Sequence, residues 1–233
     1  PVLKQLVLTS LMIPDFAPLG AALQDRPHAR CSIERFTLEN CGLLDVQGLG
    51  AAMAEGGGLT GVRLLDIRVQ TPNNEWAFEI IDALAAGAGK QLERLVWWSE
   101  DTSTQVMNGL LHVLAYGDAC PRLQSLGPYV GSGDSGDVIG TLDVAPLGTI
   151  LTGGAACSAS LTSVDLCSFP LGGTELEVLA AYMRDRRAIQ LKALSLCALW
   201  DDLSVAGLRH LVYALDSNAG DALTSLHINL KEW

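Results

Sequence analysis

The feature that most constrains this chain is a short apolar pattern that returns about every thirty residues from one end to the other. It consists of an aliphatic residue, two variable residues, a second aliphatic residue, one variable residue and a third residue that is usually apolar. The eight occurrences are Leu3/Leu6/Leu8, Ile33/Phe36/Leu38, Val62/Leu65/Ile67, Leu92/Leu95/Trp97, Leu123/Leu126/Pro128, Leu161/Val164/Leu166, Leu191/Leu194/Leu196 and Leu223/Leu226/Ile228. Their first residues are separated by 30, 29, 30, 31, 38, 30 and 32 residues. A repeat of this length is typical of a solenoid, in which each unit stacks on its neighbours.

Most occurrences are followed by a turn-prone stretch and then by apolar residues at helical spacing. Examples are Val46, Leu49 and Met53, then Ile80, Ile81 and Leu84, and later Leu208, Leu211 and Leu215. A short strand followed by a helix cannot bury its apolar faces alone, so we expect neighbouring units to share one continuous core. The alternative is an ordinary α/β domain with parallel strands and crossover helices, which the regular spacing disfavours.

The motif itself points to a known family. The segment from Ile33 to Leu43, IERFTLENCGL, matches LxxLxLxxCxL at every defined position when Ile and Phe count as aliphatic, and Cys120-Pro121-Arg122-Leu123 is similar to the link that precedes strands in many members. On these residues the chain resembles leucine-rich-repeat proteins of the long-repeat, ribonuclease-inhibitor-like class. The resemblance covers nearly the whole chain. It implies an α/β horseshoe with a concave parallel sheet and convex helices, in about seven to eight repeats of roughly 30 residues.

Several positions depart from the family pattern. The motif Cys is replaced by Leu11, Gln70, Glu100, Gly131, Phe169 and Leu199 in the other units. Pro128 takes an inward strand position, and an irregular insertion near 130–143 lengthens the fifth unit. We expect a single domain over residues 1–233. Because the chain lacks an initiator Met and a polar capping unit at either end, we expect it to be a segment of a longer chain.

Composition excludes several classes of function. The sequence has 26 acidic and 15 basic residues, a formal charge of -11, which disfavours generic binding to nucleic acid or anionic lipid. No apolar run reaches the roughly 18 residues that suggest a membrane span, and no targeting segment is visible. The six cysteines include no CxxC pair, so we expect reduced thiols and an intracellular, cytoplasmic location; the alternative is a disulfide between two distant cysteines.

Alternation along each strand identifies the residues that should face a partner. If the second and third motif positions point into the core, their neighbours point out onto the concave face in three rows. The first row is Gln5, Arg35, Leu64, Arg94, Ser125, Ser163, Ala193 and Ser225; the second is Val7, Thr37, Asp66, Val96, Gly127, Asp165, Ser195 and His227; the third is Thr9, Glu39, Arg68, Trp98, Tyr129, Cys167, Cys197 and Asn229.

The centre of this surface is the predicted partner-binding patch. Trp98 and Tyr129 occupy the same position in successive repeats and should lie near Arg94 and Arg68. Exposed aromatic residues beside arginines are typical of protein-binding hot spots. The complete predicted patch is Arg35, Asp66, Arg68, Arg94, Trp98 and Tyr129. Two alternatives stay open: Trp98 packs on Tyr129 to shield the irregular fifth repeat, or the arginines form local ion pairs.

Enzymatic chemistry is not indicated. Gly131, Gly133 and Gly136 spell GxGxxG, but Asp134 and Asp137 in the same loop would repel phosphate, and these acids lack the ligand pattern of an EF-hand. Ser158, Ser160 and Ser163 lie near Asp165 without a nucleophile elbow, and His28, His112, His210 and His227 have no metal-binding spacing. Cys167 and Cys197 share an outward position, where a thiol pair could bind a soft metal or react, although a surface of small residues is the favoured interpretation. We expect no catalytic residue, metal or cofactor.

The leading functional hypothesis is a protein–protein interaction scaffold or recognition module within a larger assembly. It depends mainly on the family resemblance, because a fold alone does not determine a function. The alternative is a sensing or inhibitory domain of a signalling regulator, similar to immune receptors or to activators of small GTPases.

Overall fold

The computed structural model describes residues 3–13, 17–24, 33–43, 48–54, 57–70, 75–99, 104–127, 142–185, 191–199, 205–218 and 223–231. Strands and helices alternate along these segments. In chain order they are β1 (Gln5–Thr9), β2 (Met12–Ile13), α1 (Ala17–Gln24), β3 (Arg35–Leu43), α2 (Leu49–Met53), β4 (Leu64–Gln70), α3 (Glu75–Ala85), β5 (Arg94–Ser99), α4 (Thr104–Tyr116), β6 (Ser125–Gly127), α5 (Val144–Leu151), the 3-10 helix η1 (Ala156–Ala159), β7 (Ser163–Leu171), α6 (Gly173–Asp185), β8 (Ala193–Leu199), α7 (Val205–Asn218) and β9 (Ser225–Lys231).

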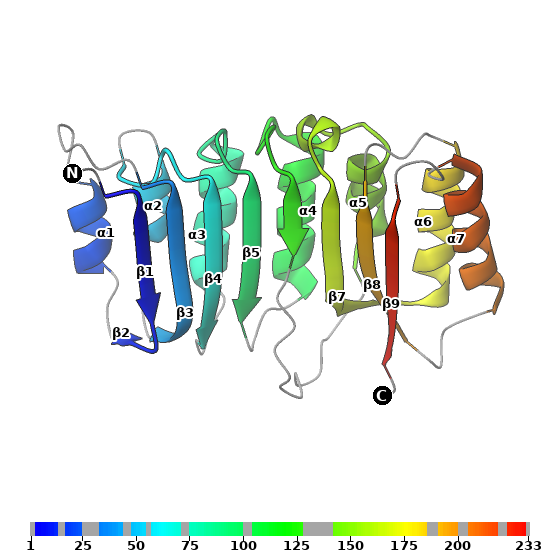
Figure 1. Ribbon diagram of the computed structural model, residues 1–233, viewed down its shortest axis with the longest axis horizontal. Helices are drawn as coiled ribbons and strands as arrows, with labels where there is room; N and C mark the ends of the chain where they lie inside the picture. Colours follow the sequence, from blue (N-terminus) through cyan, green and yellow to red (C-terminus); the bar gives the residue numbers. More distant parts are fainter. Residues whose placement is uncertain are drawn as a thin grey trace.

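The strands form one open sheet in which every pairing is parallel. The order is β1-β3-β4-β5-β6-β7-β8-β9, and the short β2 pairs with β3 beyond the end of β1. The helices form a second layer, in which each of α1 to α7 contacts the next (Figure 1). This arrangement confirms the predicted alternation of strand and helix around a parallel sheet. The strictly sequential order also excludes the order reversal of a doubly wound α/β domain.

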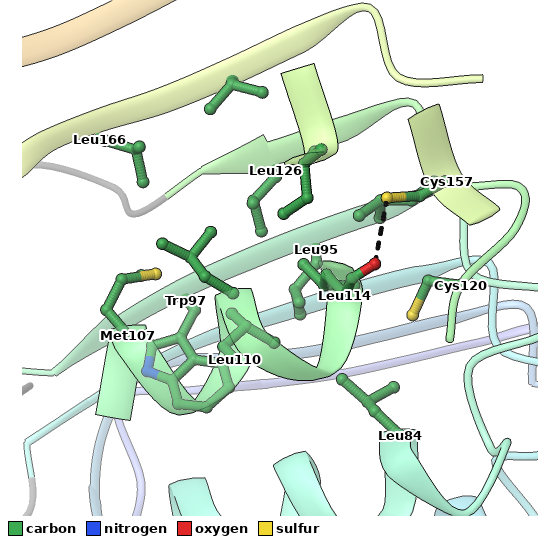
Figure 2. Close-up of a cluster of buried hydrophobic side chains, with 14 of the residues drawn as sticks. Leu84, Leu95, Trp97, Met107, Leu110, Leu114, Cys120, Leu126, Cys157 and Leu166 are labelled. Carbon is green, nitrogen blue, oxygen red and sulfur yellow. Dashed lines mark hydrogen bonds between the residues drawn. The ribbon is translucent and has the colours of Figure 1, made fainter. Parts of the chain in front are cut away.

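The core lies between the two layers. The second and third motif positions of the central units are buried, as the strand alternation predicts, and so are Ile80, Ile81 and Leu84 of α3. Figure 2 shows part of this core, where α4 packs on β5 and β6 and the Cys157 thiol lies 3.9 Å from the Leu114 carbonyl oxygen. Burial of such aliphatic side chains contributes about 1.5–3 kcal/mol each, so the shared core is the main source of stability.

Two tryptophans meet in this core. Trp97 of β5 and Trp76 of α3 have ring centroids 5.0 Å apart and planes tilted by 39°. The indole N–H groups of both are buried without a hydrogen-bond partner. The pair therefore contributes through apolar contact and ring packing, not through hydrogen bonding.

A bulge in β3 explains how the LxxLxLxxCxL motif faces the core. Leu38 and Cys41 are both buried although three positions separate them, which simple alternation would not allow. Asn40 adopts a left-handed conformation with φ of 52°, and the pairing with β4 shifts between Glu39 and Cys41. This extra residue turns Cys41 inward, where its thiol lies 3.4 Å from the Leu8 carbonyl oxygen.

Among the described residues, the fifth unit has the shortest of the eight main strands. β6 comprises Ser125–Gly127, whereas the other seven have five to nine residues. The helix α5 begins after Asp143, whose carboxylate accepts a hydrogen bond from the Ala145 amide at 3.1 Å. The insertion predicted near 130–143 lies outside the described residues, apart from its last two positions.

Candidate functional site

One face of the sheet packs against the helices; the other, on which none of the described helices packs, we call the open face. It is the face predicted to be concave. Cross-strand pairing aligns the first predicted row in register, from Gln5 on β1 through Arg35, Leu64 and Arg94 to Ser125 on β6, and onward to Ser225 on β9. Residues far apart in the sequence are thus brought side by side on a rigid support.

Accessibility differs between the rows. In the first row, Gln5, Arg35 and Arg94 are exposed and Leu64 is half-buried. In the second row, Asp66 and Val96 are buried, with 9% and 6% of their surface exposed, whereas Val7 is 41% exposed and Thr37 is half-buried. Among the described first-row residues of the central strands, the exposed side chains are those of Arg35 and Arg94.

Arg68 and Asp66 form a bidentate ion pair in the middle of this face. The Arg68 Nε and Nη2 atoms donate to the two Asp66 carboxylate oxygens, each at 2.8 Å. Arg68 Nη1 also donates to Glu39 at 3.3 Å. The local ion pair considered from the sequence is therefore present at Arg68. A guanidinium engaged in this way must give up existing contacts before it binds a partner.

The aromatic half of the predicted patch is only partly described. The backbone of Trp98 lies in β5, paired with Arg68 of β4. Tyr129 lies outside the described residues. The proximity of the two aromatic side chains consequently stays a prediction.

A groove runs along the starts of five strands and includes the first-row residue of each. It has a volume of about 520 Å³ and is lined by Lys4, Gln5, Glu34, Arg35, Arg63, Leu64, Glu93, Arg94, Gln124 and Ser125. Two ion pairs cross it between neighbouring strands, Lys4 with Glu34 at 2.8 Å and Arg63 with Glu93 at 2.7 Å. We call this feature the strand-start groove. In Figure 1 the strand starts lie along the upper edge of the sheet.

Each ion pair shifts the pKa of one of its members. The hydrogen bond and charge of Lys4 lower the pKa of Glu34, with a smaller contribution from Arg63. The hydrogen bond and charge of Glu93 raise the pKa of Arg63. The two ion pairs were not predicted from the sequence, because only the residues that flank the inward strand positions were considered. The signal was the alternation of Lys4, Glu34, Arg63 and Glu93 directly after the first motif residue of successive units.

The two cysteines predicted on the open face differ from expectation. Cys167 and Cys197 are both buried, and Cys197 pairs in register with Pro170 because β7 is irregular between Leu166 and Pro170. The Cys167 thiol lies 3.9 Å from Nδ1 of His227. Burial, with a contribution from the charge of Asp165, raises its pKa to about 12. The thiol is therefore neutral near pH 7, which disfavours a reactive thiolate at this position.

The remaining candidate side chains have structural contacts. Ser158 donates to the Ile150 carbonyl oxygen at 2.6 Å, and Ser160 lies within 3.0 Å of the carbonyl oxygens of Pro121, Leu123 and Cys157. Both hydroxyls are thus engaged with the backbone. Within the described segments, no three His, Cys, Asp or Glu side chains are grouped so that they could hold a metal ion.

Cys41, Cys120 and Cys157 are buried. His112 is exposed on α4 with its ring centroid 4.9 Å from that of Tyr116, and His210 is exposed on α7. Cys31, His28 and the GxGxxG glycines lie outside the described residues. None of the helices described here is long and apolar enough to cross a membrane.

No protein-family model matches the sequence, and no curated protein matches it significantly.

Proposed function

We propose that the chain is a leucine-rich-repeat solenoid of the ribonuclease-inhibitor-like class and acts as a protein-binding scaffold or recognition module in a larger assembly. The observation that carries this proposal is the open face of the sheet. Eight parallel strands present their side chains in register, while the opposite face is packed against helices. A broad array of side chains on a rigid support suits recognition of another macromolecule.

The chemistry of this face supports a protein partner more than a small substrate. The strand-start groove is open and crossed by ion pairs, whereas a small-molecule site is usually a concave, mostly apolar pocket. The first row combines arginine, amide, hydroxyl and aliphatic side chains, a mixture typical of protein interfaces.

The test is affinity purification of the protein from its native source at mild salt, with stoichiometric partners identified by mass spectrometry. A variant carrying Trp98→Ala and Tyr129→Ala tests the aromatic part of the predicted patch. The matched control is Tyr116→Ala, since Tyr116 is an exposed aromatic residue on the helical layer. We expect partners to be lost from the double variant and kept by the control.

The other outcomes are also informative. Partners that remain bound to the double variant would move the site away from Trp98 and Tyr129. The absence of any stoichiometric partner would contradict the scaffold function. Stimulation of GTP hydrolysis by a captured GTPase would instead favour the signalling regulator.

A further inference from the structure

Two arginines in the strand-start groove differ from the other charged residues that line it. Lys4, Glu34, Arg63 and Glu93 neutralise one another in two cross-strand ion pairs. Arg35 and Arg94 are exposed, and neither forms an ion pair or side-chain hydrogen bond with any residue in the described segments. Their guanidinium groups are available for a ligand without loss of an existing contact.

The local charge of the groove is opposite to that of the molecule. Its lining contains four basic residues and two acidic ones, a net charge of +2, in a chain of net charge -11. The difference comes from Arg35 and Arg94. A positive site on a negative protein will attract a compact acidic group and orient it during approach.

The sheet sets the spacing of the two arginines. Arg35, Leu64 and Arg94 lie side by side in register on β3, β4 and β5. Because neighbouring strands are about 4.8 Å apart, the two arginine backbones are roughly 10 Å apart. Leu64 lies between them and is half-buried, so it offers an apolar contact at the midpoint.

We propose that the strand-start groove binds an acidic polypeptide segment of a partner protein, with two carboxylates that reach Arg35 and Arg94 and an apolar side chain placed over Leu64. The proposal rests on the protein-binding function proposed above and specifies where and by what chemistry binding occurs. Each guanidinium can donate two parallel hydrogen bonds to a carboxylate, which fixes the orientation of the segment. On a helical segment, carboxylates seven residues apart match the spacing, since seven residues rise about 10.5 Å.

The same geometry disfavours a nucleic-acid ligand. Duplex DNA carries one negative charge per about 1.7 Å of helix, and its binding depends on many phosphate contacts. Here Arg35 and Arg94 alternate with Glu34 and Glu93, whose carboxylates line the groove. A polypeptide with two well-separated acids avoids these carboxylates, whereas a continuous phosphate backbone would not.

A peptide selection tests the groove and requires no identified partner. The native protein is used to select binders from a displayed library of random 12-residue peptides, and enriched peptides are synthesised for affinity measurement. We expect enrichment of paired Asp or Glu residues flanking an apolar residue. The double variant Arg35→Ala/Arg94→Ala should weaken binding of these peptides at least tenfold, and binding should weaken as salt concentration rises.

Lys192→Ala is the matched control. Lys192 is an exposed cation that directly precedes β8, three strands beyond β5, and it does not line the groove. Its removal changes the net charge by the same amount as one arginine variant. We expect peptide affinity to stay within twofold of the unmodified protein, and circular dichroism should show all variants folded.

Three outcomes would overturn the proposal. These are enrichment of peptides without acidic pairs, acidic peptides that bind the double variant unchanged, and a twelve-nucleotide oligothymidine that displaces the selected peptides. The failure of the broader function is distinguishable. If native partners are captured equally by the unmodified protein and by Arg35→Ala/Arg94→Ala, the protein-binding function stands and the groove assignment fails.

Discussion

Arg68 and Asp66 show how a residue chosen as a binding candidate can have a structural role. Asp66 is nearly buried and its carboxylate is matched by the Arg68 guanidinium. We predict that Arg68→Ala lowers the free energy of unfolding by about 1–3 kcal/mol, because it leaves a poorly solvated carboxylate without its main partner. Equilibrium urea denaturation measures the change.

Arg94→Ala is the control for this prediction, since Arg94 is exposed and unpaired among the described residues. Its substitution should change the unfolding free energy by no more than about 0.5 kcal/mol. Adding Asp66→Asn to Arg68→Ala should restore part of the lost stability. Equal losses in Arg68→Ala and Arg94→Ala would refute the structural role of the pair.

The buried thiols predict a loss of stability at alkaline pH. Burial raises the pKa of Cys120 to about 12 and that of Cys157 to about 11, from 9.0. A thiol that stays neutral in the folded state but ionises in the unfolded state contributes stability that is complete below pH 9 and is lost as pH rises toward 11–12. At pH 10 each thiol should reduce the unfolding free energy by about 1 kcal/mol.

The measurement compares unfolding at pH 7.5 and pH 10 for the unmodified protein and for Cys157→Ala. The variant lacks one titrating thiol, so its stability should fall less between the two pH values. An identical fall in both proteins would show that Cys157 does not titrate in this way. The comparison cancels ionisation of Lys and Tyr residues, which both proteins share.

The sequence predicted outward positions better than it predicted exposure. The alternation of a strand determines the side on which a residue lies, and Arg35, Leu64 and Arg94 fall in one row as expected. Exposure depends on the size of neighbours on adjacent strands, so Asp66, Val96 and Cys197 could not be identified as buried from their own strands. The strand-start groove was missed because it joins variable positions that belong to five different units.

At the scale of single elements, Asp143 determines the start of α5. Its side chain accepts a hydrogen bond from Ala145, and its own amide donates to Asn108 of α4 at 2.8 Å. We predict that Asp143→Ala lowers the unfolding free energy by about 1 kcal/mol, whereas Asp143→Ser, which keeps a capping oxygen, has a smaller effect. Thermal denaturation followed by circular dichroism distinguishes them, and equal losses would contradict a capping role.

The ends of other strands depend on residues that are particular to one unit and are not part of the repeat pattern. β3 continues from Arg35 to Leu43, past the left-handed residue Asn40, because the bulge keeps the strand paired with β4. The repeat pattern predicted where strands begin, since the first and second motif residues recur regularly. It did not predict where they end, because each end depends on the residues of one unit alone.

At the scale of the whole molecule, a stack of units makes stability depend on position. Leu95 and Leu226 occupy the same motif position in different units. Leu95 is fully buried on β5, which lies between β4 and β6, whereas Leu226 on the edge strand β9 is 37% exposed. We predict a loss of about 2–5 kcal/mol for Leu95→Ala and a much smaller loss for Leu226→Ala.

Hydrogen exchange monitored by mass spectrometry tests this prediction together with urea denaturation. Leu226→Ala should increase exchange mainly in β9 and neighbouring segments, because most contacts between units join adjacent ones. Leu95→Ala should increase exchange across the centre of the stack. Uniform effects of both substitutions over the whole chain would contradict a nearest-neighbour architecture.

The left-handed residue at Asn40 has a consequence for how such a chain can change length. Asn40 adds one position to β3 relative to β4, yet Cys41 and Val69 face the same core and pair in register. A unit can therefore gain or lose one residue at this point while every inward side chain keeps its side. The bulge absorbs one extra residue without reversing the alternation of the strand. A single-residue insertion or deletion at this point therefore need not turn the core-facing side chains that follow toward solvent.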